Sequence, residues 1–115
     1  MLDQLVESWQ INHRVTLRLL NALSDDALRA TLSTRGGRDV ARQLAHVHEV
    51  RLTFAEITAK TNREAKLPHF AKEETPNKKQ LKTNLDISAQ AVETTIRESW
   101  ANGGKTAGFK RGLIP

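Results

Sequence analysis

The chain has 115 residues, 38% of them apolar and only five aromatic, so it suits one domain with a modest, mainly aliphatic core. It has no cysteine, which excludes disulfides, thiolate metal sites and a cysteine nucleophile, and no apolar run approaches the roughly 20 residues of a membrane span. The net charge of +5 gathers in residues 63–115, where 10 lysines and arginines face 6 acidic residues.

These properties also bear on compartment and partners. The N-terminal segment is amphipathic and acidic rather than a signal peptide, and the lack of cysteine fits a reducing compartment, so we expect a cytoplasmic protein. A basic half favours polyanions in general, but its lysines are spread among glutamates and do not alternate with aromatic residues, as a single-strand nucleic-acid site requires. Nucleic-acid binding is therefore the weakest function considered, and no membrane association is expected.

The first helix is predicted over about residues 2–22, where apolar residues recur at three- and four-residue steps. They form one stripe, with His13 near its middle. The stripe consists of Leu2, Leu5, Val6, Trp9, His13, Leu17, Leu20 and Leu23. Ser24 then interrupts the pattern and can cap a short turn of helix that ends at Leu28. Residues 31–38 are rich in Thr, Ser and Gly and are predicted to be a loop.

The second helix is predicted to begin at Asp39, which suits the N-cap, and to end near Lys60. Its broad apolar face comprises Val40, Leu44, Val47, Leu52, Phe54, Ala55 and Ile57. At about 100° per residue, His48 projects into the middle of this face and His46 falls on its margin. The face is wider than two neighbouring helices need, which indicates a further partner, either a fourth helix or another chain.

A long polar connection over residues 62–75 separates the second helix from the third and lets the third helix return from the far end of a bundle. The third helix is predicted to begin at Thr75, a capping residue, with Pro76 at the first helical position, and to close at Trp100. Small hydroxyl residues in its apolar stripe allow close helix approach or leave room for a pocket. They are Ser88, Thr95 and Ser99. The fold predicted is an all-α, antiparallel bundle in up-down-up order.

The four histidines are the candidate metal ligands, although none belongs to an HExxH or HxxxH pair. His46 and His48 stand two apart, so on a helix they point about 160° from each other and cannot chelate one ion as an adjacent pair. His13 and His48 both lie on predicted core faces, where antiparallel packing of the first two helices would bring them together to bind a divalent metal. The alternative is that each is a core histidine satisfied by a hydrogen bond. His69 is predicted to be exposed in its loop.

Other catalytic patterns are missing from the sequence. No serine lies in a nucleophile elbow, and Gly36-Gly37 lacks the spacing of a phosphate-binding loop. Glu49 and Glu56 stand seven apart on the polar side of the second helix, which is more typical of a solvated face than of an acid–base pair. The residues by themselves leave open whether the protein is an enzyme.

Several stretches, taken in order, resemble the DinB-like family. The segment WQINHR from Trp9, followed by LLNAL from Leu19, is similar to the first helix of that family. The segment GGRDVARQLAHVHEVR from Gly36 resembles the start of its second helix and is the most specific part of the match. Residues 72–96, with ETPNKKQL near their start, and residues 103–110 are also similar, so the resemblance covers essentially the full chain.

The resemblance implies a four-helix bundle, commonly homodimeric, that holds a divalent metal such as zinc or nickel through three histidines. One ligand lies in the AH segment of the second helix, where the matching residue is His46, and the other two form an HxxxH pair on the fourth helix. Some relatives are metal-dependent thiol S-transferases that act with low-molecular-weight thiols. The printed sequence ends at Pro115, where the fourth helix would begin, so we expect residues 1–115 to form one domain that lacks this helix and two of its ligands.

Helical angles favour His48 as the inward residue, whereas the resemblance favours His46. We take His46 as the first candidate metal ligand, followed by His48 and His13. The first hypothesis is a metal-binding DinB-like protein, related to the thiol S-transferases, that borrows ligands from another chain. The second is a non-catalytic helical module that associates, as a dimer, through the groove left by the missing helix.

Overall fold

Five helices make up the described part of the chain, in a computed structural model that describes residues 1–31 and 38–104. The three long helices are α1 (Leu2–Ala22), α3 (Val40–Thr58) and α5 (Lys78–Ala101), and the two short ones are α2 (Asp25–Leu28) and α4 (Lys60–Glu64). No strand is formed within these residues, which confirms the all-helical prediction. The predicted loop glycines Gly36 and Gly37, and the C-terminal residues 105–115, lie outside the described residues.

Side-chain caps fix the start of two helices where the sequence predicts them. Ser24 accepts a hydrogen bond from the backbone N–H of Ala27 at 3.0 Å and begins α2. Asp39 accepts one from the N–H of Arg42 at 2.8 Å and begins α3. Each cap satisfies a backbone donor that has no partner within its own helix. At the other end of the fold, Gly103 adopts a φ of 72° just after α5, the left-handed conformation that ends many helices.

The start of α5 differs from the prediction by two residues. The cap is Asn77, whose side chain accepts from the N–H of Gln80 at 2.8 Å, while the Gln80 side chain accepts from the N–H of Asn77 at 2.9 Å. This reciprocal capping box satisfies two donors, whereas a Thr75 cap would satisfy one. Pro76 therefore precedes the helix, where it is buried.

The second long helix is also shorter than predicted. α3 ends at Thr58 because Ala59 is extended, with φ of −138° and ψ of 121°. The chain then forms α4, so Asn62, expected in a polar loop, belongs to a helix and is buried. Its amide Nδ2 donates to Thr95 Oγ1 on α5 at 3.1 Å. The chain reversal at Ala59 thus adds a buried polar contact to the bundle.

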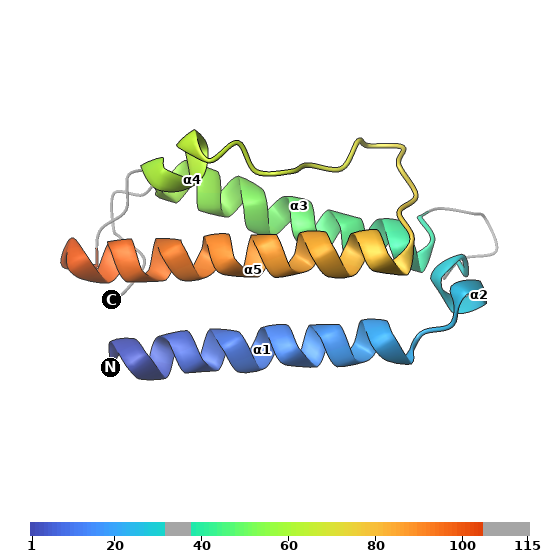
Figure 1. Ribbon diagram of the computed structural model, residues 1–115, viewed down its shortest axis with the longest axis horizontal. Helices are drawn as coiled ribbons and strands as arrows, with labels where there is room; N and C mark the ends of the chain where they lie inside the picture. Colours follow the sequence, from blue (N-terminus) through green and yellow to red (C-terminus); the bar gives the residue numbers. More distant parts are fainter. Residues whose placement is uncertain (32–37, 105–115) are drawn as a thin grey trace.

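α5 lies between the other two long helices, parallel to α3 and antiparallel to α1 (Figure 1). Two hydrogen bonds between α3 and α5 show that these helices run in the same direction. Arg51 donates to Leu85 O, and Thr58, later in α3, donates to Thr95, later in α5. The expected up-down-up order is therefore corrected, because α1 runs one way and both α3 and α5 run the other. The connection over residues 65–77 makes this possible, because it runs back along α3 before α5 begins (Figure 1).

Small residues let α5 approach its neighbours closely. Ser88, Thr95 and Ser99 are each no more than 1% exposed, so the choice left open by the sequence is resolved as close packing. Around them, the largest fully buried side chains are leucines: Leu20, Leu28, Leu52, Leu81 and Leu85. None of the described helices is long and apolar enough to cross a lipid bilayer.

Candidate functional site

His48 is a core histidine. Its side chain is fully buried on α3, packs edge-on against the Phe70 ring, and donates from Nε2 to the carbonyl of Pro68 at 2.7 Å. A carbonyl can only accept, so Nε2 carries the proton and Nδ1 is the free lone pair, buried and without a partner among the described residues. Burial lowers the pKa of His48, against the opposing effects of the Pro68 carbonyl and of Glu49. The imidazole is therefore held neutral as a support for the connection.

His13 lies instead in a polar chain that joins the three long helices. Its Nε2 lies 2.7 Å from Oδ1 of Asp86 on α5, and its Nδ1 accepts from Nη1 of Arg51 on α3 at 3.3 Å. Arg51 is only 8% exposed, stacks on the Trp9 ring at 4.9 Å, and also donates to Leu85 O. Both nitrogens of His13 are engaged, so it does not offer a free ligand.

His46 is the candidate ligand that remains available. It is exposed on α3 and makes no hydrogen bond or ion pair with the rest of the described chain. It borders two hollows, one shared with Arg42 and Lys72 and one shared with Val50 and Ile57. The structure therefore separates the three histidines predicted to bind metal: His48 in the core, His13 between helices and His46 at the surface.

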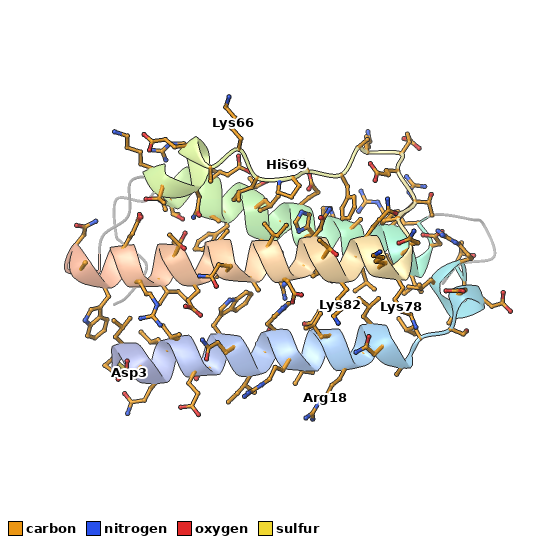
Figure 2. All side chains as sticks on the ribbon, viewed as in Figure 1. Asp3, Arg18, Lys66, His69, Lys78 and Lys82 are labelled. Atoms are coloured by element: carbon orange, nitrogen blue, oxygen red, sulfur yellow. The ribbon has the colours of Figure 1, made fainter. Side chains whose placement is uncertain are left out.

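His69 was predicted to be merely exposed, but the structure gives it two partners. Its Nδ1 lies 2.9 Å from Glu49 Oε1 and its Nε2 lies 2.5 Å from Glu56 Oε1, both on α3. Partial burial acts to lower the pKa of His69, but the hydrogen bonds and charges of Glu49, and then of Glu56, outweigh it and raise that pKa. Figure 2 shows His69 on the connection that runs beside α3. In the sequence, the feature that could have indicated this pairing is the seven-residue spacing of Glu49 and Glu56, which places both carboxylates on one face of α3, two turns apart.

The described residues do not complete a three-histidine metal site. No group of three or more His, Cys, Asp or Glu side chains in residues 1–31 and 38–104 is arranged to hold an ion. His46 alone has a free imidazole facing solvent, and it supplies one ligand where a stable site needs at least three. The described residues therefore supply one ligand of a metal site, His46, and not the full set.

An apolar strip follows His46 along α3. Val47, Val50 and Ile57 are 40%, 54% and 48% exposed, and the last two line a shallow hollow with Phe54. Isolated exposed apolar residues are ordinary, but a continuous strip along one helix is typical of a surface that binds another element. The sequence predicted that the apolar face of the second helix is wider than two neighbouring helices need. The structure places the additional apolar residues on the side of α3 that α5 does not cover.

A second exposed apolar strip lies on α1. Ile11, Val15 and Leu19 recur at four-residue steps and are 45%, 59% and 55% exposed. Residues four apart share one helical face, so these side chains form a line along α1 that α5 leaves open. Two of the three long helices therefore present apolar surface to solvent.

The fold and the site together define an all-helical bundle protein with a surface histidine that has no partner among the described residues and lies beside an open apolar helix face. The chain belongs to the DinB family, whose profile matches residues 1–105. No significant match was found among curated proteins or among solved structures.

Proposed function

We propose that this chain is a divalent-metal-binding protein of the DinB family whose site forms at His46 and is completed by ligands from outside residues 1–104. The observation that carries the proposal is the free, exposed imidazole of His46 beside the open apolar strip of α3. A helix packed on that strip would bring its own side chains next to His46. Zinc or nickel is the kind of ion that such imidazole-rich sites prefer.

Nothing in the described residues competes for His46. Its nearest carboxylate along the helix, Glu49, already accepts hydrogen bonds from His69 and from the backbone N–H of Phe70 at 3.1 Å. His46 is therefore available to an incoming ion without breaking a contact of the fold. Thiol transfer, as implied by the likeness to S-transferases, would depend on the ligands that another segment or chain supplies.

The test is elemental analysis after purification without chelators. We expect bound zinc or nickel that is lost in His46→Ala and retained in His13→Ala. His13→Ala is the matched control because that imidazole is engaged by Asp86 and Arg51. A folded protein that contains no metal would refute the proposal, and metal retained in His46→Ala would remove His46 from the site.

The second candidate function is a non-catalytic module that associates with a second copy of this chain. The apolar strips on α1 and α3 support it, because exposed strips of this kind are unfavourable on a monomer in water. Sedimentation equilibrium should then show a dimer at micromolar concentration, converted to monomer by Val50→Lys. Thr83→Lys adds the same charge to an exposed position on α5 and should leave the dimer intact. A clean monomer throughout this concentration range would exclude the module.

A further inference from the structure

A basic hollow lies where the start of α3 meets the connection to α5, and of its lining the metal proposal uses only His46. Its volume is about 220 Å³. Arg38, Arg42, His46 and Lys72 contribute the basic groups of its lining, and Glu49 and Glu74 the acidic ones. The two sides of the hollow come from segments about thirty residues apart in the chain, so only the tertiary fold forms it.

The Arg42 guanidinium has hydrogen-bonding capacity to spare. Its Nη2 donates to Lys72 O at 3.4 Å and to Glu73 Oε2 at 3.5 Å, both longer than the usual range of about 2.7–3.2 Å. Its Nε is buried and has no partner among the described residues. A buried donor without an acceptor is unfavourable, so such a group commonly marks a place where a water molecule or a ligand binds.

The other bases of the hollow are also uncommitted. The side chains of Arg38, His46 and Lys72 make no hydrogen bond or ion pair within the described residues. Surface lysines and arginines without partners are ordinary singly, but here they share the lining of one concave space with Arg42. Their charges therefore add in the same small volume, where a concave wall strengthens the field.

The acidic groups of the hollow do not cancel this charge. Glu49 is paired with His69 and accepts from the Phe70 N–H, so both of its oxygens are occupied. Glu74 accepts from the N–H of Ala71 at 3.2 Å and keeps its charge, but the permanent cations of the lining, Arg38, Arg42 and Lys72, outnumber its two carboxylates. Glu73 reaches Arg42 from outside the lining, and its side chain is 81% exposed, so water screens that pair. The lining keeps an excess of positive charge after these pairings.

We infer that this hollow binds a compact oxyanion, a phosphate or carboxylate group, with Arg42 as its central ligand and Arg38 and Lys72 on either side. A planar guanidinium matches two oxygens of such an anion at once. The volume is below the roughly 300–1,000 Å³ of pockets that take drug-sized molecules, so the hollow suits a small anion or the charged end of a larger one.

The experiment titrates the ¹⁵N-labelled full chain, in metal-stripped buffer, with inorganic phosphate and separately with malonate, against sodium chloride at equal ionic strength. We expect saturable shifts of the amide signals of residues 38–46 and 70–74 with at least one of the two oxyanions. Phosphate alone or malonate alone would identify the preferred group. Shifts equal to those in chloride, or spread over the surface, would overturn the inference.

Variants then assign the residues. Arg42→Gln should weaken binding at least about tenfold, because a charge-assisted contact is lost, and Arg42→Lys should recover part of it through charge alone. Arg38→Gln is a second variant, because the Arg38 side chain makes no hydrogen bond or ion pair within the described residues and its one such contact there, from Gln43 Nε2, is to the backbone carbonyl. Arg18→Gln is the matched control, since Arg18 is exposed on α1, away from the connection that lines the hollow (Figure 2). Equal weakening in Arg18→Gln and Arg42→Gln would show general charge attraction and overturn the site. Because no metal is present, the result is independent of the metal proposal.

Discussion

Arg51 on α3 donates a hydrogen bond from Nη1 to Nδ1 of His13 on α1, across 3.3 Å, although α5 is the helix that packs against both. The same guanidinium donates to Leu85 O on α5, and His13 continues the chain to Asp86. A buried arginine thus ties the three long helices together at one level. No carboxylate contacts it among the described residues, so its charge is stabilised by the Trp9 ring and by neutral acceptors.

Replacing Arg51 should destabilise the bundle. Arg51→Met leaves His13 Nδ1 without its donor and removes one donor from Leu85 O, which still accepts from Ser88 Oγ at 3.1 Å, and this is expected to lower the free energy of unfolding by about 1–3 kcal/mol. Urea unfolding followed by circular dichroism measures the change. The double variant Arg51→Met/His13→Phe should lose less than the sum of the two single variants, because the two side chains share one contact. Strict additivity of the two single effects would show that the Arg51–His13 contact carries no coupling. Arg14→Met, on the exposed side of α1, is the control and should leave the free energy of unfolding nearly unchanged.

The capping box at the start of α5 can be tested against the cap that the sequence suggested. Asn77→Ala removes the acceptor for the Gln80 N–H and should lower the free energy of unfolding by about 1 kcal/mol. Thr75→Ala should change it by less than about 0.5 kcal/mol, since Thr75 lies outside the helix. Thermal or urea unfolding of both variants decides between the two caps, and a larger effect at Thr75 would contradict the geometry.

Asn62 should be one of the more sensitive polar positions of the fold. Its Nδ2 donates to Ala55 O and Ala91 O, each at 3.0 Å, and to Thr95 Oγ1, so a single amide joins α4 to α3 and α5. Asn62→Ala removes these three contacts, while Ala55 O still accepts from the Ala59 N–H and Thr95 Oγ1 from Thr58 Oγ1, so the free energy of unfolding should fall by about 1 kcal/mol. Asn12→Ala, on the exposed face of α1, is the matched control. Equal small effects in urea unfolding would mean that water replaces the Asn62 contacts.

His69 should make stability depend on pH. Its pKa is raised in the folded protein above the ordinary value of 6.5, so its stabilising contribution is fully present below about pH 6.5 and is lost as the pH rises through the folded-state pKa. His69→Ala should therefore lower the free energy of unfolding more near pH 6 than near pH 9. The side chain is 42% exposed, so solvent screening should keep the difference below about 1 kcal/mol.

The comparison of His69→Ala with the unsubstituted chain also isolates His69 from His48. Burial lowers the pKa of His48, so protonation of the unfolded chain below about pH 6.5 favours unfolding, which is the opposite slope. That slope is present in both proteins, and most of it cancels in the difference because burial, its largest cause, is the same in both; the smaller part that comes from the charge of His69 does not cancel. A difference between the two proteins that is constant from about pH 6 to pH 9 would show that the Glu49 and Glu56 contacts do not depend on the charge of His69.

Much of the fold follows from the sequence by local rules. The three- and four-residue spacing of apolar side chains predicts α1 over its observed bounds, Leu2–Ala22, because that spacing is the repeat of the α-helix. Ser24 and Asp39 predict the starts of α2 and α3, because a short polar side chain can reach the free backbone donors of the first turn. The inward direction of His48 also follows from its angle on the helix, and the burial observed confirms it.

The tertiary structure decided what those local rules leave open. Helix direction depends on the path of the connection between α4 and α5, which no periodicity encodes, so α5 proved parallel to α3. Asn62, Arg51 and His69 are polar residues that a sequence places at the surface, yet partners from distant segments bury the first two and pair the third. The sequence alone thus determined which segments are helical and which face of each is apolar. Only packing determined that Pro68 and Phe70 are the neighbours of His48 and that His46 has no partner within the described residues, because both depend on which segment covers each side of α3.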